Sequence, residues 1–209
     1  MRIVDAAQRS PEWFAARAGK VTGSRAADVL AKVKSGEAAA RRDYRLHLAV
    51  ERITGTPMEN GFVSADMQRG IDLEATAAAR YEAATGHLLR HTGFLAHDTL
   101  AAGCSLDGDV DDFTGIVEIK CPKSTTHVGY LRAGVVPSGY LPQITHNLWI
   151  SGAQWCDFVS LDDRLPAGLD WLCVRVVRDE AAIGAYVAEV EKFLAEVDAE
   201  YSALVALRG

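Results

Sequence analysis

The apolar positions in the first part of the chain recur every three or four residues, which is the spacing of amphipathic helices. This spacing predicts helices over residues 41–53 and 66–85. A shorter helix is predicted to begin at Ser10, which caps it, with Pro11 in its first turn. Another helix start is predicted at residues 22–24, so the chain is expected to be mainly helical up to Gly86.

After Gly86 the pattern changes to short apolar or alternating runs bounded by Gly, Asp and Pro, which are typical of strands. Helical spacing returns over residues 125–132 and 141–150. The predicted strands are residues 87–97, 100–106, 115–121, 154–161 and 171–178. This order predicts a single α/β domain over residues 1–209, with a central mixed β-sheet flanked by helices.

A long helix is predicted from Asp179 to the end of the chain. Its apolar positions keep an alternating spacing of four and three: Ile183, Val187, Val190, Leu194, Val197, Tyr201 and Leu204. The ordinary interpretation is a helix that covers the sheet with its apolar side. A seam between subunits is the alternative that the spacing leaves open.

Composition and charge narrow the classes of protein to consider. The 209 residues are 49% hydrophobic and 24% charged, which excludes a disordered or collagen-like chain. The net charge of −6 argues against a broad basic coat for nucleic acid. However, residues 1–60 carry 11 Lys and Arg against 7 Asp and Glu, whereas residues 98–120 carry 1 against 6. A local basic patch near an acidic site therefore stays possible, with salt-sensitive binding through few contacts.

The cysteines and the N-terminus indicate the compartment. The cysteines at positions 104, 121, 156 and 173 form no C-x-x-C pair, which argues against structural zinc or an iron–sulfur cluster. The N-terminal residues lack the apolar run of a signal peptide, and no stretch approaches the roughly 18 apolar residues of a membrane span. We therefore expect a cytoplasmic protein with reduced thiols and no membrane partner.

A carboxylate and a lysine share one face of the predicted strand at residues 115–121. The period of two puts Glu118 and Lys120 on the same side, with Cα atoms about 6.6 Å apart at a rise of about 3.3 Å per residue. Taken alone, such a pair is more often an ordinary surface ion pair. Asp107 lies eleven positions before Glu118, and a hairpin between them would bring both carboxylates beside the lysine. Two hard oxygen ligands and a lysine make up a magnesium site that hydrolyses phosphodiesters.

The same acidic residues also match part of a calcium-loop pattern. Asp107, Asp109, Asp111 and Glu118 fall at its positions 1, 3, 5 and 12. Position 6, however, is Asp112 where the sharp turn requires Gly, and the flanks are predicted strands rather than helices. We therefore interpret Asp109, Asp111 and Asp112 as a solvated hairpin tip.

These motifs resemble those of a known nuclease family. Ser-Leu-Asp-Gly at residues 105–108, followed by Glu-Ile-Lys-Cys-Pro at residues 118–122, resembles the PD-(D/E)xK motif of the lambda exonuclease and YqaJ-like viral recombinase family. Glu74 matches the helical glutamate that completes the metal site in that family, and Gln143 matches the glutamine that follows the motif on a helix. The resemblance implies a restriction-endonuclease-like core.

The N-terminal region extends the resemblance. Residues 12–17 and 21–24 are similar to the family segment whose arginine and serine hold a terminal 5′-phosphate. In order, the matching elements run from residue 12 to about residue 195, while the last fifteen residues match nothing. Leu106 stands where the family motif has proline, and Gly23 occupies a variable position that bears on the geometry of the phosphate pocket.

The resemblance implies a magnesium-dependent 5′→3′ exonuclease, an alkaline exonuclease, that degrades double-stranded DNA to mononucleotides and leaves 3′ single-stranded overhangs. It also implies a ring-shaped homotrimer, and a single-strand annealing protein as partner in phage recombination. Two Mg²⁺ ions, or Mn²⁺ in their place, would be held by Asp107, Glu118, Glu74 and the backbone carbonyl of Ile119. Lys120 and Gln143 would position the attacking water, and the 5′-phosphate would be held by Arg17, Ser24 and Trp13.

The predicted site residues outside the strand motif also have ordinary structural interpretations. Glu74 is offset from the apolar side of its helix, so it could be solvated, and Trp13 could pack into the core. Gln143 could be an amide on a helix surface. For the whole chain, the alternatives are another nuclease of this superfamily, RecB-like or an endonuclease, and a non-catalytic module that binds DNA ends.

Overall fold

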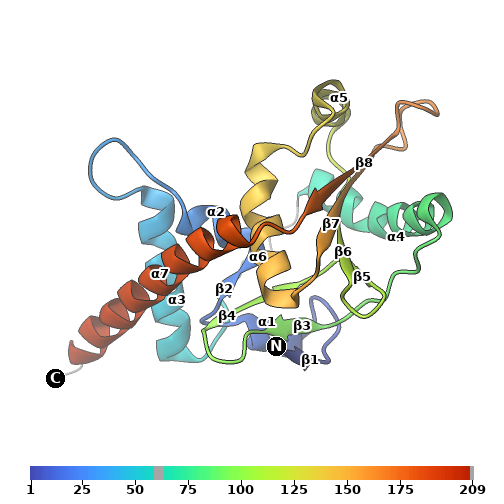
Figure 1. Cartoon of the computed structure of the whole chain (residues 1–209). Coiled ribbons are helices and arrows are strands. Elements are labelled where there is room, and N and C mark those ends of the chain that lie inside the picture. Colours follow the sequence, from blue (N-terminus) through green and yellow to red (C-terminus); the bar gives the residue numbers. More distant parts are fainter. Residues whose placement is uncertain (59–63, 208–209) are drawn as a thin grey trace.

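The computed structural model describes residues 1–58 and 64–207 (Figure 1). The strands are β1 (Arg2–Val4), β2 (Val21–Thr22), β3 (Phe94–Ala96), β4 (Ala102–Ser105), β5 (Gly108–Val110), β6 (Gly115–Lys120), β7 (Trp155–Leu161) and β8 (Trp171–Val177). The helices are α1 (Pro11–Arg17), α2 (Ala26–Val29), α3 (Ala39–Thr54), α4 (Ala65–Thr85), α5 (Ser124–Ala133), α6 (Leu141–Ser151) and α7 (Glu180–Ala206), with 3₁₀ turns η1 (Gly23–Arg25) and η2 (Ser138–Tyr140).

The α/β class, the flanking helices and the long C-terminal helix are confirmed. The described strands divide between two mixed four-stranded sheets, in the orders β1-β3-β4-β2 and β5-β6-β7-β8. Each sheet contains one parallel pair, β2 with β4 and β6 with β7. The predicted strand over residues 87–97 is shorter than expected, because only Phe94–Ala96 pairs continuously and Arg90 makes an isolated bridge to Asp109. The strands β1, β2 and β5 were not predicted, since two or three residues are too few to show a period of two.

Strand β6 lies in the interior with both faces covered. Ile116 packs in the larger apolar cluster, whereas Val117 and Ile119 pack in a smaller one against Ala77 and Tyr81 of α4. The predicted alternation of faces is therefore confirmed. Because helices cover both sides of the sheet at this strand, a polar residue in its middle is withdrawn from water.

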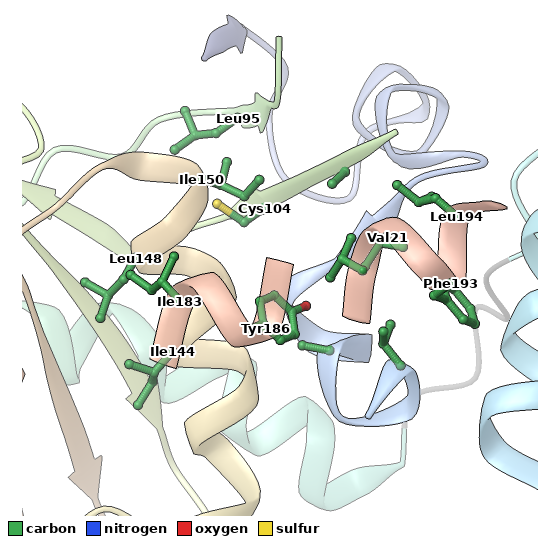
Figure 2. Close-up of a cluster of buried hydrophobic side chains, with 14 of the residues drawn as sticks. Val21, Leu95, Cys104, Ile144, Leu148, Ile150, Ile183, Tyr186, Phe193 and Leu194 are labelled. Atoms are coloured by element: carbon green, nitrogen blue, oxygen red, sulfur yellow. The ribbon is translucent and has the colours of Figure 1, made fainter. Parts of the chain in front are cut away.

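Helix α6 connects the two sheets. It contacts β3 and β4 of one sheet and β7 of the other, and it also contacts η1 and α7. Figure 2 shows Ile144 and Leu148 of α6 beside Ile183 and Tyr186 of α7 in the larger cluster. Residues on different faces of α6 can therefore reach the strands of both sheets and the N-terminal turn η1.

Most of the apolar stripe of α7 is buried within this chain, although Tyr201 is exposed, and the stripe covers helices rather than the sheet. Ile183, Val190, Leu194 and Val197 are buried, and α7 packs mainly on α3 and α6 (Figure 1). The helix begins as predicted, because the Asp179 carboxylate accepts hydrogen bonds from two backbone N–H groups of its first turn. No helix in the described part of the chain is long and apolar enough to cross a membrane.

Candidate active site

The hairpin predicted between the two motif carboxylates is present. Strand β5 pairs antiparallel with β6, and Gly108 lies opposite Val117. Asp107 immediately precedes β5, and its Oδ2 accepts a hydrogen bond from the backbone N–H of Ile119 over 2.7 Å. The first carboxylate is thus fixed to the strand that carries the second, Glu118.

Glu118 lies at the centre of a buried polar cluster. Its side chain is 2% exposed, so the alternative of a surface ion pair with Lys120 is wrong. Its Oε1 accepts hydrogen bonds from Gln143 Nε2 over 2.6 Å and from Lys120 Nζ, and its Oε2 accepts one from Asn147 Nδ2 over 3.1 Å. Gln143 therefore faces inward from α6 and is not a surface amide. Three donors from two elements hold this carboxylate in one orientation.

The charges of the cluster act on one another. Burial raises the pKa of Glu118 to about 7, and the Asp107 and Glu74 carboxylates add to the rise while Lys120 opposes it. Burial favours a lower pKa for Lys120, but the carboxylates of Glu118 and Asp107 outweigh it and raise the pKa above its ordinary value. Lys120 therefore stays an ammonium ion beside a group of carboxylates.

Glu74 belongs to the same electrostatic group. It lies half-buried on α4, and burial raises its pKa, followed by the effect of Asp107. It lines a cleft of about 550 Å³ together with Arg9 and His91, and the Arg9 charge opposes the rise in its pKa. Glu74 is therefore not the solvated surface residue of the alternative interpretation. The next residue on the helix, Ala75, is exposed.

The donor set is suited to a divalent cation in charge and in atom type. The Asp107 carboxylate raises the pKa of both Glu118 and Glu74, and together the three carboxylates offer the hard oxygen ligands that Mg²⁺ and Mn²⁺ accept. Among residues 1–58 and 64–207, however, no group of three or more His, Cys, Asp or Glu side chains is arranged to hold a metal ion. The oxygens of Glu118 face Lys120, Gln143 and Asn147 instead.

The residues of the predicted phosphate site, Trp13, Arg17 and Ser24, form a second region together with Arg25, which was not predicted; we call it the cationic region. Trp13 is 8% exposed, so it packs in the core as the ordinary interpretation expected. Its ring also lies 4.1 Å from the Arg17 guanidinium carbon, and its Nε1 donates to Ser105 Oγ over 2.8 Å. Trp13 therefore joins Arg17 to the strand that leads into Asp107.

Two arginines of the cationic region, Arg17 and Arg25, line a small pocket. Arg17, Arg25, Thr22 and Tyr44 line this pocket of about 20 Å³. Ser24 is exposed, and its Oγ lies 3.5 Å from Thr22 Oγ1. The pocket is therefore narrow and carries two guanidinium groups. The Ser24 hydroxyl lies beside Thr22, one of the residues that line it.

The cationic and carboxylate regions lie close enough to share an electrostatic neighbour. Burial raises the pKa of the Cys104 thiol, the Glu118 carboxylate raises it further, and the Arg17 charge opposes the rise. Cys104 lies on β4 and is buried. The two regions, about 100 positions apart in the sequence, thus both lie near strand β4.

Two polar residues of the site were not selected from the sequence. Asn147 is 1% exposed and bonds to Glu118, and its spacing of four from Gln143 on a helix is the signal that could have identified it. Ser105 was visible only as part of the motif, and its contact with Trp13 depends on the packing of α1 against the sheet.

The predicted solvated tip is wrong at one position. Asp109 is fully buried, and its carboxylate makes an ion pair with Arg90 over 2.9 Å. Asp111 and Asp112 are exposed as expected, and Arg90 also contacts Asp112. Because Asp109 is engaged by an arginine and the flanks are strands, the calcium-loop alternative is not supported.

Comparisons with known proteins agree with this arrangement. The family model of the YqaJ-like viral recombinase domain matches residues 12–154. The crystal structure of an alkaline exonuclease, LHK-Exo, from Laribacter hongkongensis is 43% identical, with a TM-score of 0.86 over 95% of this chain and 98% of that chain. The structure of LHK-Exo in complex with dAMP is 44% identical, with a TM-score of 0.85 over 93% and 96%.

A more distant structure shares the fold. The phage related exonuclease from Haemophilus somnus 129PT is 14% identical, with a TM-score of 0.66 over 91% of this chain and 96% of that chain. Among curated proteins, none matches the chain.

Proposed function

Because the chain belongs to the YqaJ-like viral recombinase domain family, we propose that it is a magnesium-dependent 5′→3′ exonuclease of double-stranded DNA ends. The observation that carries the proposal is the buried carboxylate Glu118, held by Lys120, Gln143 and Asn147 beside two further carboxylates. The similarity to alkaline exonucleases over almost the full length of both chains supports the same chemistry.

The metal ligands in this proposal are Asp107, Glu118 and Glu74, with the backbone carbonyl of Ile119 as a further ligand. When bound, divalent ions activate water and neutralise charge that develops on the phosphate. The raised pKa values of Glu118 and Glu74 support this assignment, because a cation removes the carboxylate repulsion that causes part of the rise. Mg²⁺ is the proposed ion, and Mn²⁺ is the alternative with the same ligand preference.

Lys120 and Gln143 position the reacting groups. Lys120 keeps its proton next to Glu118 and Asp107, so it acts as a fixed positive charge towards the scissile phosphate and not as a base. Gln143 donates to the same oxygen of Glu118, so both side chains converge at one point. An attacking water at that point would be oriented by both.

The cationic region would bind the 5′-phosphate of the strand that is degraded. A guanidinium offers a planar pair of donors to a phosphate, and the Trp13 ring holds Arg17 in place from one side. Ser24 would add a hydroxyl donor from η1. A phosphate held at one end of the site sets the direction of digestion, which accounts for a 5′→3′ polarity.

The proposal extends to the assembly and the partner, on the basis of the family resemblance. We infer a ring-shaped homotrimer around the DNA, which makes digestion processive because a closed ring does not dissociate easily. The products would be mononucleotides and 3′ overhangs. A single-strand annealing protein would then coat the overhang in phage recombination, as the description of the matching family as a viral recombinase supports.

The proposal is tested by digestion of linear duplexes that carry 5′-phosphate or 5′-hydroxyl ends, with and without Mg²⁺. We expect Mg²⁺-dependent release of mononucleotides and a preference for phosphate ends. Cutting of covalently closed circular DNA would indicate a RecB-like or restriction-type endonuclease instead. End binding without digestion under any divalent ion would indicate a non-catalytic module and overturn the proposal.

A further inference from the structure

A single buried amide touches both regions of the site. Asn147 lies on α6 with a side chain almost fully buried, and its Nδ2 donates to Glu118 Oε2 over 3.1 Å. Its Oδ1 is also buried and has no hydrogen-bond partner among the described residues. A buried carbonyl without a donor costs about 1–3 kcal/mol. The side chain therefore keeps an orientation that is unfavourable for one of its two polar atoms.

Glu118 explains this orientation. Rotation of the amide by half a turn would place Oδ1 against the carboxylate oxygen, where two acceptors repel each other. The bond to Glu118 thus forces the carbonyl to point away from the metal ligands. The carbonyl points instead at the turn η1, which packs on α6.

The Asn147 carbonyl lies against Gly23. A Cβ at position 23 would be 2.3 Å from Asn147 Oδ1 and 3.5 Å from the His146 ring. Gly23 does not adopt a positive φ, so glycine is required here for space and not for backbone conformation. The backbone that carries Ser24 is therefore seated directly on the amide that holds Glu118.

We propose that Asn147 is a positioning residue that couples the 5′-phosphate loop, residues 22–25, to the metal carboxylate Glu118. One planar amide fixes both distances, so movement of the loop displaces the carboxylate. The inference rests on the proposed function and adds a role that the family motif does not include. With this coupling, a 5′-phosphate bound at the loop would raise the rate of cleavage as well as strengthen the binding of the DNA end.

The first test replaces the amide. For Asn147→Ala, and for Asn147→Leu, which keeps the number and branching of the side-chain heavy atoms, we expect kcat on 5′-phosphate ends to fall about ten- to a hundredfold, the range for a lost bond to a charged group. On 5′-hydroxyl ends kcat should change by less than about threefold, so the phosphate preference in kcat disappears. Binding of 5′-phosphate ends in EDTA, measured by fluorescence anisotropy, should keep its preference over 5′-hydroxyl ends, since Arg17 is intact.

The second test targets the contact between Gly23 and the Asn147 carbonyl. Gly23→Ala should disturb the loop by colliding with the Asn147 carbonyl, and this collision is absent when residue 147 is Ala. We therefore expect Gly23→Ala to lower the phosphate preference in the wild-type background and to have much less effect in the Asn147→Ala background. Additive effects in this double-mutant cycle would show that the two residues act independently and would overturn the inference.

A matched control separates positioning from stability. Ser151 lies on the same helix, is buried, and donates to the backbone carbonyl of Asn147 over 2.6 Å without touching Glu118. Ser151→Ala should lower the melting temperature but keep the phosphate preference in kcat. Loss of the preference in this variant, or its retention in both Asn147 variants, would overturn the inference. Absence of metal-dependent digestion by the wild type would instead reject the proposed function.

Discussion

The carboxylate region and the cationic region differ in how far their polar side chains are withdrawn from solvent. Glu118 is buried and bound by three side-chain donors, and Asp107 is bound to the backbone of β6. In the cationic region, Ser24 is exposed and Arg17 is half-buried on the Trp13 ring. The carboxylate region is thus buried and organised before substrate arrives, whereas the cationic region lies nearer the surface.

This difference suggests a division of labour. Preorganised charges act on the transition state, because they need no rearrangement at the moment of reaction. Cationic side chains nearer the surface contribute to substrate binding and selection, because a guanidinium offers a planar pair of donors to a phosphate. We therefore expect changes in the carboxylate region to lower kcat, and changes in the cationic region to alter the choice between DNA ends.

The largest effect is expected from Lys120→Ala. The loss of one fixed donor at the reacting phosphate lowers kcat by about 10²- to 10³-fold, while binding of DNA ends without metal should persist. The measurement is single-turnover digestion together with end binding in EDTA. Lys192→Ala, an exposed lysine on α7, is the control. Unchanged kcat in Lys120→Ala would remove Lys120 from the chemistry.

Helix α6, which joins the two regions, carries a buried histidine that should make the protein less stable at low pH. His146 is buried, its Nδ1 is 2.8 Å from the Tyr186 hydroxyl and its Nε2 is 2.9 Å from the Gly103 carbonyl, so the neutral ring both accepts and donates. Burial lowers its pKa from 6.5 to about 4. The unfolded state therefore binds the proton more readily, and the free energy of unfolding should fall as the pH drops from about 6.5 to about 4, by up to about 3 kcal/mol.

The check is denaturant unfolding at several pH values with His146→Gln and, as a control, His87→Gln. The His146 variant should lose stability less steeply over this range than the wild type, and the His87 variant should follow the wild type. Equal slopes for wild type and His146→Gln would show that His146 does not cause the pH dependence.

A smaller effect is expected from Arg17. For Arg17→Lys, which keeps the charge but loses the planar pair of donors, the preference for 5′-phosphate over 5′-hydroxyl ends in kcat/KM should fall about tenfold. The rate on 5′-hydroxyl ends should stay nearly constant. Arg132→Ala, at the exposed end of α5, serves as the control. If the preference persists in Arg17→Lys, the paired donors of Arg17 do not select the phosphate end.

The smallest effect is expected from Asp111→Asn at the exposed tip of the hairpin. Asp111 has a φ of 47°, a conformation that Asn also tolerates, so stability should change by less than about 0.5 kcal/mol. Digestion should be unaffected. A loss of tight calcium binding in this variant would revive the calcium-loop interpretation and would weaken the contrast between buried and exposed carboxylates.

Local pattern was sufficient for much of the site. The period of two in β6 predicts that Glu118 and Lys120 share a face, and the hairpin predicts Asp107 beside them, as found. Local pattern failed where a distant residue decides burial. Asp109 looks like part of a polar tip, but Arg90 from before β3 neutralises it in the interior.

The sequence by itself determined the α/β class, the main helices and strands, and the proximity of Asp107, Glu118 and Lys120, because these depend on periodicity and on neighbours close in the chain. Only the tertiary structure decided that the strands form two sheets and that α6 lies between them. It also decided that Asn147 meets both Glu118 and Gly23. The reason is physical: which face of α6 is apolar can be read from spacing, but the elements that pack on its other faces depend on contacts between residues far apart in the chain.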